Sequence, residues 1–124
     1  MKENNTDRII VNNKRAYHDY FIDETYECGI VLTGTEIKAI RTGKVNLQDS
    51  FCYIKKNEMF ISGMNISKYE KGNIFNHVPD QTRKLLLHKI EITRLQTKLQ
   101  KEGYTLVPTK VYIPRGLAKV EIGL

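Results

Sequence analysis

The chain has 124 residues, of which 40% are hydrophobic, enough for one domain that buries roughly two-thirds of its unfolded surface. Its net charge of +6 and its pI near 9.3 fall in the range of nucleic-acid-binding domains. No apolar run approaches the ~20 residues that span a bilayer, and the polar start MKENNTDR lacks a secretory h-region, so we expect a cytoplasmic protein without a membrane partner.

The start of the chain is predicted to be a flexible arm over residues 1–12, followed by a single domain over residues 13–124. The first strand candidates are Tyr17–Ile22 and Tyr26–Leu32, because both are rich in aromatic and β-branched residues. They place the beginning of the domain in the β class.

The most informative segment runs from Gly29 to Phe51, GIVLTGTEIKAIRTGKVNLQDSF. After an apolar run, isoleucines at helical spacing predict a short helix over Glu36–Thr42, which Gly43 ends. Lys38 and Arg41 lie on the opposite face of this helix. A strand, a short helix and another strand, with cations at the corner, would present a surface to phosphate groups.

The middle of the chain predicts a hairpin of Phe51–Lys56 and Met59–Ser62 around Asn57–Glu58. A loop follows over Lys68–Asp80, which is rich in Gly, Asn and Pro. The three consecutive leucines within Arg83–His88 fit either a strand or a helix, and we predict a strand because a better helix begins directly after it.

That helix is predicted over Lys89–Glu102, where apolar residues recur at helical spacing, and Gly103 ends it. Tyr104–Ile113 and Ala118–Ile122 then form a hairpin about Pro114–Gly116. Six or seven short strands with two or three helices predict a mainly β fold, an antiparallel Greek-key barrel of the oligonucleotide-binding (OB) type.

Cysteines and histidines give little sign of a reactive or metal site. Cys28 and Cys52 lie in apolar alternating segments, and because cytosolic disulfides are rare we expect two reduced core thiols. His18, His77 and His88 show no metal-ligand spacing, so no metal and no cofactor is expected. Without a nucleophile elbow or a Gly-rich phosphate loop, an enzyme is not expected either.

Four blocks of sequence, taken together, resemble one bacterial family. They are Asn13–Ile22, Tyr26–Phe51, Asn76–His88 and Gly103–Tyr112. In this order they are similar to small protein B, the SsrA-binding protein, over nearly all of residues 10–124. The resemblance implies an OB-related barrel that binds the tRNA-like domain of transfer-messenger RNA and brings that RNA to stalled ribosomes in trans-translation. It also implies that the protein is not an enzyme, and we expect a monomer.

The resemblance places RNA contacts at Asn13, Glu27 and Leu86. Cations near these blocks are added as candidates by proximity: Lys14, Arg15, Lys38, Arg41, Lys44, Arg83 and Lys84. An amide can both donate to and accept from a base edge, and a carboxylate can accept from cytosine N4. Each phosphate contact is expected to add roughly 0.7 to the slope of log K against log salt concentration.

Aromatic rings beside Lys14 and Arg15 are further candidates, because rings can stack on unpaired bases. Strand alternation places His18 and Tyr20 on one face and Tyr17 on the other. One of these faces belongs to the core, and the sequence leaves open which one. His18 therefore joins the predicted RNA-binding set.

Three features depart from the family pattern. Tyr17 stands where many members carry a basic residue, and Val78 and Gln81 stand where an acid and an arginine are commoner. The sequence stops at Leu124, where the family continues into a long basic tail. The resemblance therefore implies that RNA binding is retained and puts full ribosomal tagging in doubt.

Other functions also fit a small basic barrel. A general single-strand binder would use the same rings and cations without regard to RNA shape. A protein-interaction module would show little salt dependence. A weak ribonuclease built on His and Lys would degrade RNA during incubation.

Overall fold

The computed structural model describes residues 7–14, 22, 24–69, 76–103, 105–114 and 119–123. The strands are β1 (Asp7–Asn12), β2 (Thr25–Ile30), β3 (Val45–Asn46), β4 (Phe51–Lys55), β5 (Glu58–Ser62), β6 (Asn65–Ile66), β7 (Arg83–Leu86), β8 (Val107–Pro114) and β9 (Lys119–Gly123). The helices are α2 (Gly34–Arg41) and α3 (Lys89–Glu102). The predicted mainly β fold with helices is confirmed for these residues.

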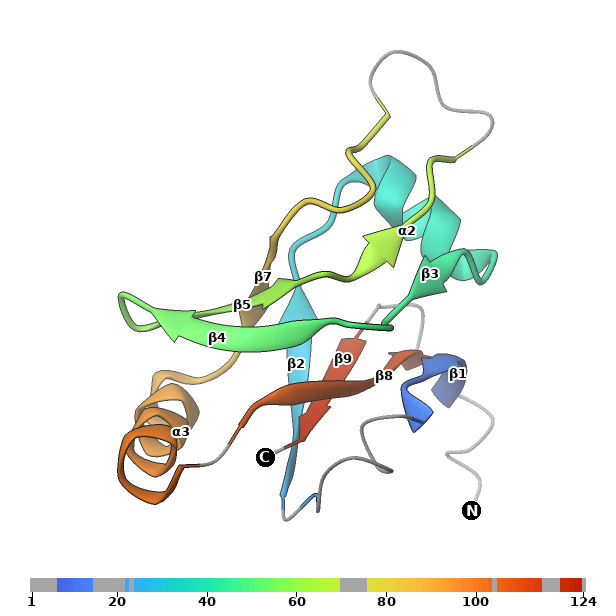
Figure 1. Ribbon diagram of the computed structural model, residues 1–124. Helices are drawn as coiled ribbons and strands as arrows, with labels where there is room; N and C mark the ends of the chain where they lie inside the picture. Colours follow the sequence, from blue (N-terminus) through green and yellow to red (C-terminus); the bar gives the residue numbers. More distant parts are fainter. Residues whose placement is uncertain are drawn as a thin grey trace.

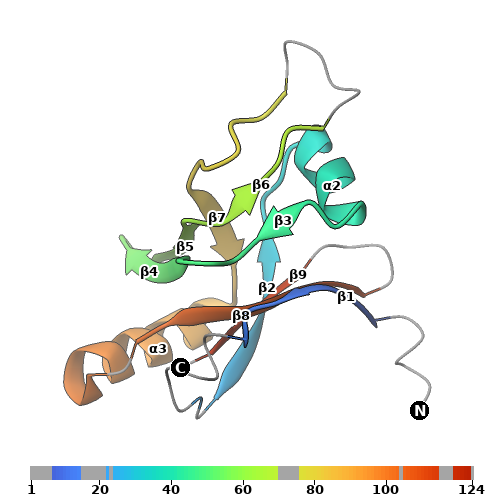
Figure 2. The ribbon, with the colours of Figure 1, turned by 45° about the vertical axis from the view of Figure 1, so that its right-hand side comes forward.

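One large antiparallel sheet dominates the molecule (Figure 1). Its strands follow the order β1-β8-β9-β2-β7-β5-β4, and β3 pairs with β6 in a separate two-stranded sheet. The large sheet bends until β4 approaches the start of β8, where the Cys52 backbone N–H donates to the Leu106 carbonyl at 3.3 Å. In both ribbon views α2 and α3 lie at opposite ends of this sheet (Figure 2).

The predicted N-terminal arm is wrong for Asp7–Asn12, because these residues form β1. This strand pairs with β8, and Ile10 and Val11 pack against the core. Its apolar, β-branched run suits a strand, but the pairing partner lies about a hundred residues further along the chain. The strand predicted over Tyr17–Ile22 lies outside the described residues except for Ile22, which is in no strand.

The hairpin of β4 and β5 is present, with its turn one residue earlier than predicted. Lys56 and Asn57 form the turn with φ of 53° and 62°. Positive φ at both central residues is the signature of a type I′ turn, whose twist matches that of the flanking strands. As a result Lys55 pairs with Glu58, and Tyr53 pairs with Phe60.

Both helices have identifiable ends. Thr33 caps α2: its hydroxyl accepts from the Glu36 backbone N–H, and the Glu36 carboxylate accepts from the Thr33 N–H. This capping box starts α2 two residues before the prediction. Helix α3 has the predicted bounds, and Gly103 follows it with a φ of +71°.

The core lies on the inner face of the bent sheet and includes both cysteines. Cys28 and Cys52 are buried and keep reduced thiols, as predicted. Burial raises the pKa of the Cys52 thiol, and the neighbouring Cys28 adds to this effect. Neither described helix is both long and apolar enough to cross a membrane. Within the described residues no group of three or more His, Cys, Asp or Glu side chains is placed to hold a metal ion.

Candidate nucleic-acid interface

Glu27 and Leu86 lie on the same outer face of two adjacent strands. Because Cys28 of β2 points into the core, the alternation of the strand turns Glu27 and Gly29 outward. Leu86 of β7 pairs with Gly29 and is 50% exposed. A Cβ on Gly29 would lie 3.4 Å from Leu86 Cβ, so the leucine lies directly over this glycine. The structure thus brings together two of the three residues that the resemblance singles out.

The Glu27 carboxylate is oriented by a tyrosine from another strand. The Tyr112 hydroxyl donates to Glu27 Oε2, reaching from β8 across β9. Tyr112 is only 8% exposed, and Lys110 Nζ lies 5.4 Å from the centroid of its ring. Sequence reasoning missed Tyr112, because the contact depends on the register of three strands. With one oxygen held in place, Glu27 presents the carboxylate in a defined direction.

Asn13 is fixed to β8 by two hydrogen bonds. Its backbone N–H donates to the Thr109 carbonyl at 2.7 Å, and its side-chain Nδ2 donates to the Pro108 carbonyl at 2.9 Å. The amide therefore anchors the chain just after β1 and leaves Oδ1 as an acceptor within the described part of the chain. Lys14, the next residue, is exposed.

The prediction that Arg83 contacts RNA is wrong, because this side chain is buried. Arg83 is 3% exposed, and its Nε donates to the carboxylate of Glu36, which is also buried. Its remaining nitrogens donate to backbone carbonyls at 2.8–3.3 Å: those of Met64, Val78, Pro79 and Gln81. Arg83 thus ties α2 to the loop before β7 and is not available to a ligand.

Glu36 completes this buried network. Burial opposes ionisation of its carboxyl group, but hydrogen bonds from the Thr33 N–H, the Gln81 amide and Arg83 hold its pKa below the usual value. Nearby, His77 is buried between Thr35, at 2.8 Å from Nδ1, and the Ile66 carbonyl, at 2.8 Å from Nε2. His77 therefore belongs to the structural support of α2.

The predicted cations of the corner helix form a separate group. Lys38 and Arg41 are exposed on α2, and Lys44 is exposed just after it. Lys38 Nζ lies 5.6 Å from the centroid of the Tyr69 ring. In Figure 1 α2 stands beyond the C-terminal end of β2, so this group lies past the end of the strand that carries Glu27.

Lys84 stands on the outer face of β7 together with Leu86. Its Nζ donates to Glu58 Oε2 at 2.6 Å, and its side chain remains 41% exposed. Two further members of the predicted set, Arg15 and His18, lie outside the described residues.

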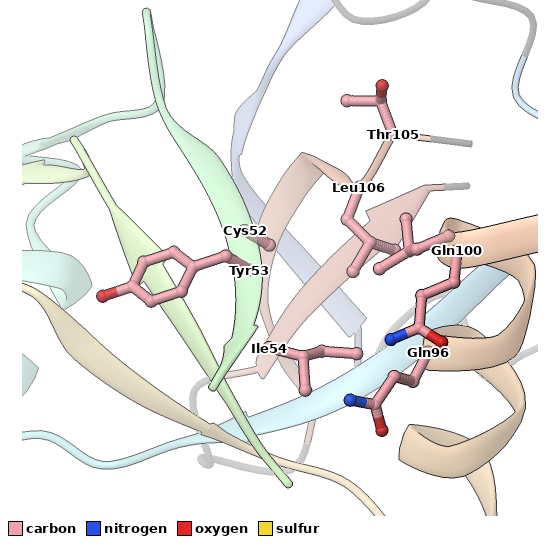
Figure 3. A pocket seen from close by; sticks show the side chains of 8 residues that line it. Cys52, Tyr53, Ile54, Gln96, Gln100, Thr105 and Leu106 are labelled. Atoms are coloured by element: carbon pink, nitrogen blue, oxygen red, sulfur yellow. The ribbon is translucent and has the colours of Figure 1, made fainter. Parts of the chain in front are cut away.

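A pocket of about 380 Å³ lies between β4, α3 and the start of β8, and none of the predicted contacts that the structure describes lines it. Figure 3 shows the Gln96 and Gln100 amides reaching from α3 toward β4, while the Tyr53 ring points away from them. The pocket is thus separate from the outer face that carries Glu27 and Leu86.

Comparison with known proteins places the chain in one family. The family described as SmpB protein matches residues 10–124. An SsrA-binding protein of Thermoanaerobacter pseudethanolicus is 60% identical over 94% of this chain and 75% of its own length. One from Shouchella clausii is 56% identical over 100% of this chain and 80% of its own.

A solved structure described as "tmRNA-SmpB: a journey to the center of the bacterial ribosome" contains a chain of the same fold. It is 50% identical and matches with a TM-score of 0.75 over 92% of this chain and 80% of that chain. This chain belongs to the SmpB protein family.

Proposed function

We propose that the chain binds the tRNA-like domain of transfer-messenger RNA and delivers this RNA to stalled ribosomes in trans-translation. Its relatives are named SsrA-binding proteins, and the matching solved structure concerns tmRNA-SmpB and the bacterial ribosome. The structural observation that carries the proposal is the exposed pair of Glu27 and Leu86 on adjacent strands of a basic domain. The role is that of a monomeric RNA-binding protein in the cytoplasm, without catalysis.

The proposed scaffold is a single OB-type barrel, in which the bent sheet closes through β4 and β8. The hydrogen bond from Cys52 to Leu106 supports this closure, and so does the contact between β1 and β3. Barrels of the OB type bind oligonucleotides on the outer face of part of the sheet and on the adjoining loops.

On this face Glu27 supplies the base-specific contact. Phosphates repel a carboxylate at an RNA surface. A hydrogen bond that the carboxylate accepts from a base, such as one from the N4 amino group of cytosine, offsets this repulsion. Tyr112 fixes one oxygen of the carboxylate, and Leu86 supplies an apolar surface beside it. The exposed cations Lys14 and Lys84 then contribute phosphate contacts, which position the RNA but do not specify its sequence.

The test is binding of a tRNA-like RNA by the Glu27→Gln variant. Losing a charge-assisted bond to a base is expected to weaken binding by about tenfold, because such a contact contributes ~1–3 kcal/mol. Asp49→Asn is the matched control: it removes the same charge from an exposed turn residue whose φ of 64° suits asparagine. Equal affinities for the two variants would contradict the proposal.

A competition experiment separates shape recognition from general single-strand binding. We expect the complex with tRNA-like RNA to survive an excess of a polypyrimidine oligonucleotide. A general single-strand binder would instead be stripped from its target by that competitor.

A further inference from the structure

Three aromatic side chains line the outer face of the β4–β5 hairpin, and we call them the aromatic strip: Phe51, Tyr53 and Phe60. Strand alternation places them there, because Cys52, Met59 and Ile61 between them point into the core. The Tyr53 and Phe60 rings stack with centroids 5.6 Å apart and planes 27° apart. The centroids of the Phe51 and Tyr53 rings lie 6.0 Å apart, with an angle of 37° between the ring planes.

The strip is open on its outer side. Phe51 is 50% exposed, and Tyr53 and Phe60 are only partly buried. Pairing of rings across strands would stabilise the hairpin by roughly 0.5–1.5 kcal/mol. That contribution accounts for the Tyr53–Phe60 stack, but it does not account for a phenylalanine left half exposed at the end of the row.

The strip is continuous with the Glu27–Leu86 face. Tyr53 pairs with Phe60 and Phe60 pairs with Lys84, so these three side chains form one row across β4, β5 and β7. Leu86 lies two residues beyond Lys84 on the same outer face. Val31, which is 52% exposed, adjoins the row because its backbone N–H donates to the Lys84 carbonyl at 3.0 Å.

The charges around the strip favour an anionic occupant. Lys55 and Lys56 are exposed at the turn of the hairpin, and the partly exposed Lys84 lies beside Phe60. Glu58 balances one of these three cations through its ion pair with Lys84. Rings flanked by an excess of cations are the combination that binds unpaired nucleotides, in which the bases stack and the phosphates meet lysines.

We propose that the aromatic strip stacks on unpaired bases of the same transfer-messenger RNA that the Glu27–Leu86 face binds. The inference rests on the proposed function and extends its interface from β2 and β7 to β4. Phe51 is the outermost ring; the Tyr53 ring lies next to it, and the Phe60 ring stacks on Tyr53. The RNA strand would leave the tRNA-like fold at Leu86 and run across Lys84 toward the hairpin.

Replacing Phe51 by leucine tests the stacking directly. Phe51→Leu keeps an apolar side chain and removes the ring, so the protein should keep its melting temperature. The affinity for full-length transfer-messenger RNA is expected to fall about fivefold, with an unchanged slope of log K against log salt, because stacking releases no counterions. Phe51→Trp enlarges the ring and should preserve or increase the affinity.

Val78→Ala is the control, because Val78 is 61% exposed and lies in the loop before β7, outside the strip. An unchanged affinity for Phe51→Leu, or an equal loss for Val78→Ala, would overturn the inference. So would a Phe51→Leu protein that binds the free RNA normally and fails only on ribosomes, because the occupant would then be ribosomal.

Crosslinking provides a second readout that does not depend on variants. Transfer-messenger RNA substituted with 4-thiouridine should, on irradiation, crosslink to peptides that contain Phe51, Tyr53 or Phe60. Crosslinks confined to other peptides would contradict the inference. If Glu27→Gln weakens binding while Phe51→Leu does not, the inference fails and the proposed function stands. If Glu27→Gln has no effect, it is the proposed function that fails.

Discussion

Arg83 and Lys84 are adjacent cations on β7, yet the structure gives them opposite roles. Arg83 points inward to the buried carboxylate of Glu36, whereas Lys84 points outward beside Leu86. Since alternate residues of a strand face opposite sides of the sheet, one position decides whether a cation supports the fold or faces a ligand. A cluster of basic residues in a sequence therefore overstates the size of the binding surface, and the two cations can be tested separately.

The largest expected effect follows from removing the inward cation. Arg83→Ala leaves Glu36 buried without its ionic partner, which typically costs ~3–5 kcal/mol of stability. We expect a large fall in the urea midpoint, and any loss of RNA affinity should disappear under conditions that keep the variant folded. A stability close to that of the parent would contradict the structural role given to Arg83.

The second effect is a pH dependence of the stability that arises from Glu36. The pKa of Glu36 is lower in the folded protein than in the unfolded chain. The ionised carboxylate therefore contributes fully to the free energy of unfolding at pH values above the unfolded pKa of 4.5. This contribution is lost as the pH falls through the folded pKa. The Glu36→Gln variant should lack this contribution, so urea unfolding of the two proteins should differ most near neutral pH and converge in acid. Parallel stability curves down to low pH would exclude this cause.

A smaller effect is expected for Tyr112→Phe. This change removes the hydroxyl that orients Glu27, and one such hydrogen bond contributes about 1 kcal/mol. The affinity for tRNA-like RNA should fall roughly fivefold. In combination with Glu27→Gln the change should add little further loss, because the two groups act together. Fully additive losses in this double-mutant cycle would separate Tyr112 from the action of Glu27.

The smallest effect is expected for Lys84→Ala, the outward counterpart of Arg83→Ala. Losing one phosphate contact should lower the slope of log K against log salt by roughly 0.7 and leave the stability nearly unchanged. Lys101→Ala, at the end of α3, serves as the control for a distant exposed cation. Identical salt slopes for Lys84→Ala and the parent would place Lys84 outside the interface.

Local patterns in the sequence predicted the C-terminal ends of the two helices well. The periodicity that ends at Gly103 predicted the bounds of α3, and Gly43 marked the end of α2. The strand β1 was missed because its partner is β8, and Arg83 was misassigned because Glu36 lies 47 residues before it. Contacts of this kind depend on tertiary packing, which no local pattern contains.

The aromatic strip was missed because of a single residue. A turn at Asn57–Glu58 would pair Tyr53 with Ser62, whereas the observed turn at Lys56–Asn57 pairs Tyr53 with Phe60. A shift of one residue in a two-residue turn changes every cross-strand pair in the hairpin. For Glu27 and Leu86, the sequence supplied the residues through resemblance, and only the pairing of β2 with β7 places them on one face.

The central claim is that RNA lies on the outer face of β2 and β7. Backbone amide NMR of the labelled protein, titrated with tRNA-like RNA at moderate salt, tests it most directly. We predict the largest chemical-shift changes at Glu27, Gly29 and Leu86, with smaller changes on α2. Changes confined to Lys38, Arg41 and their neighbours, with β2 and β7 unaffected, would contradict the account.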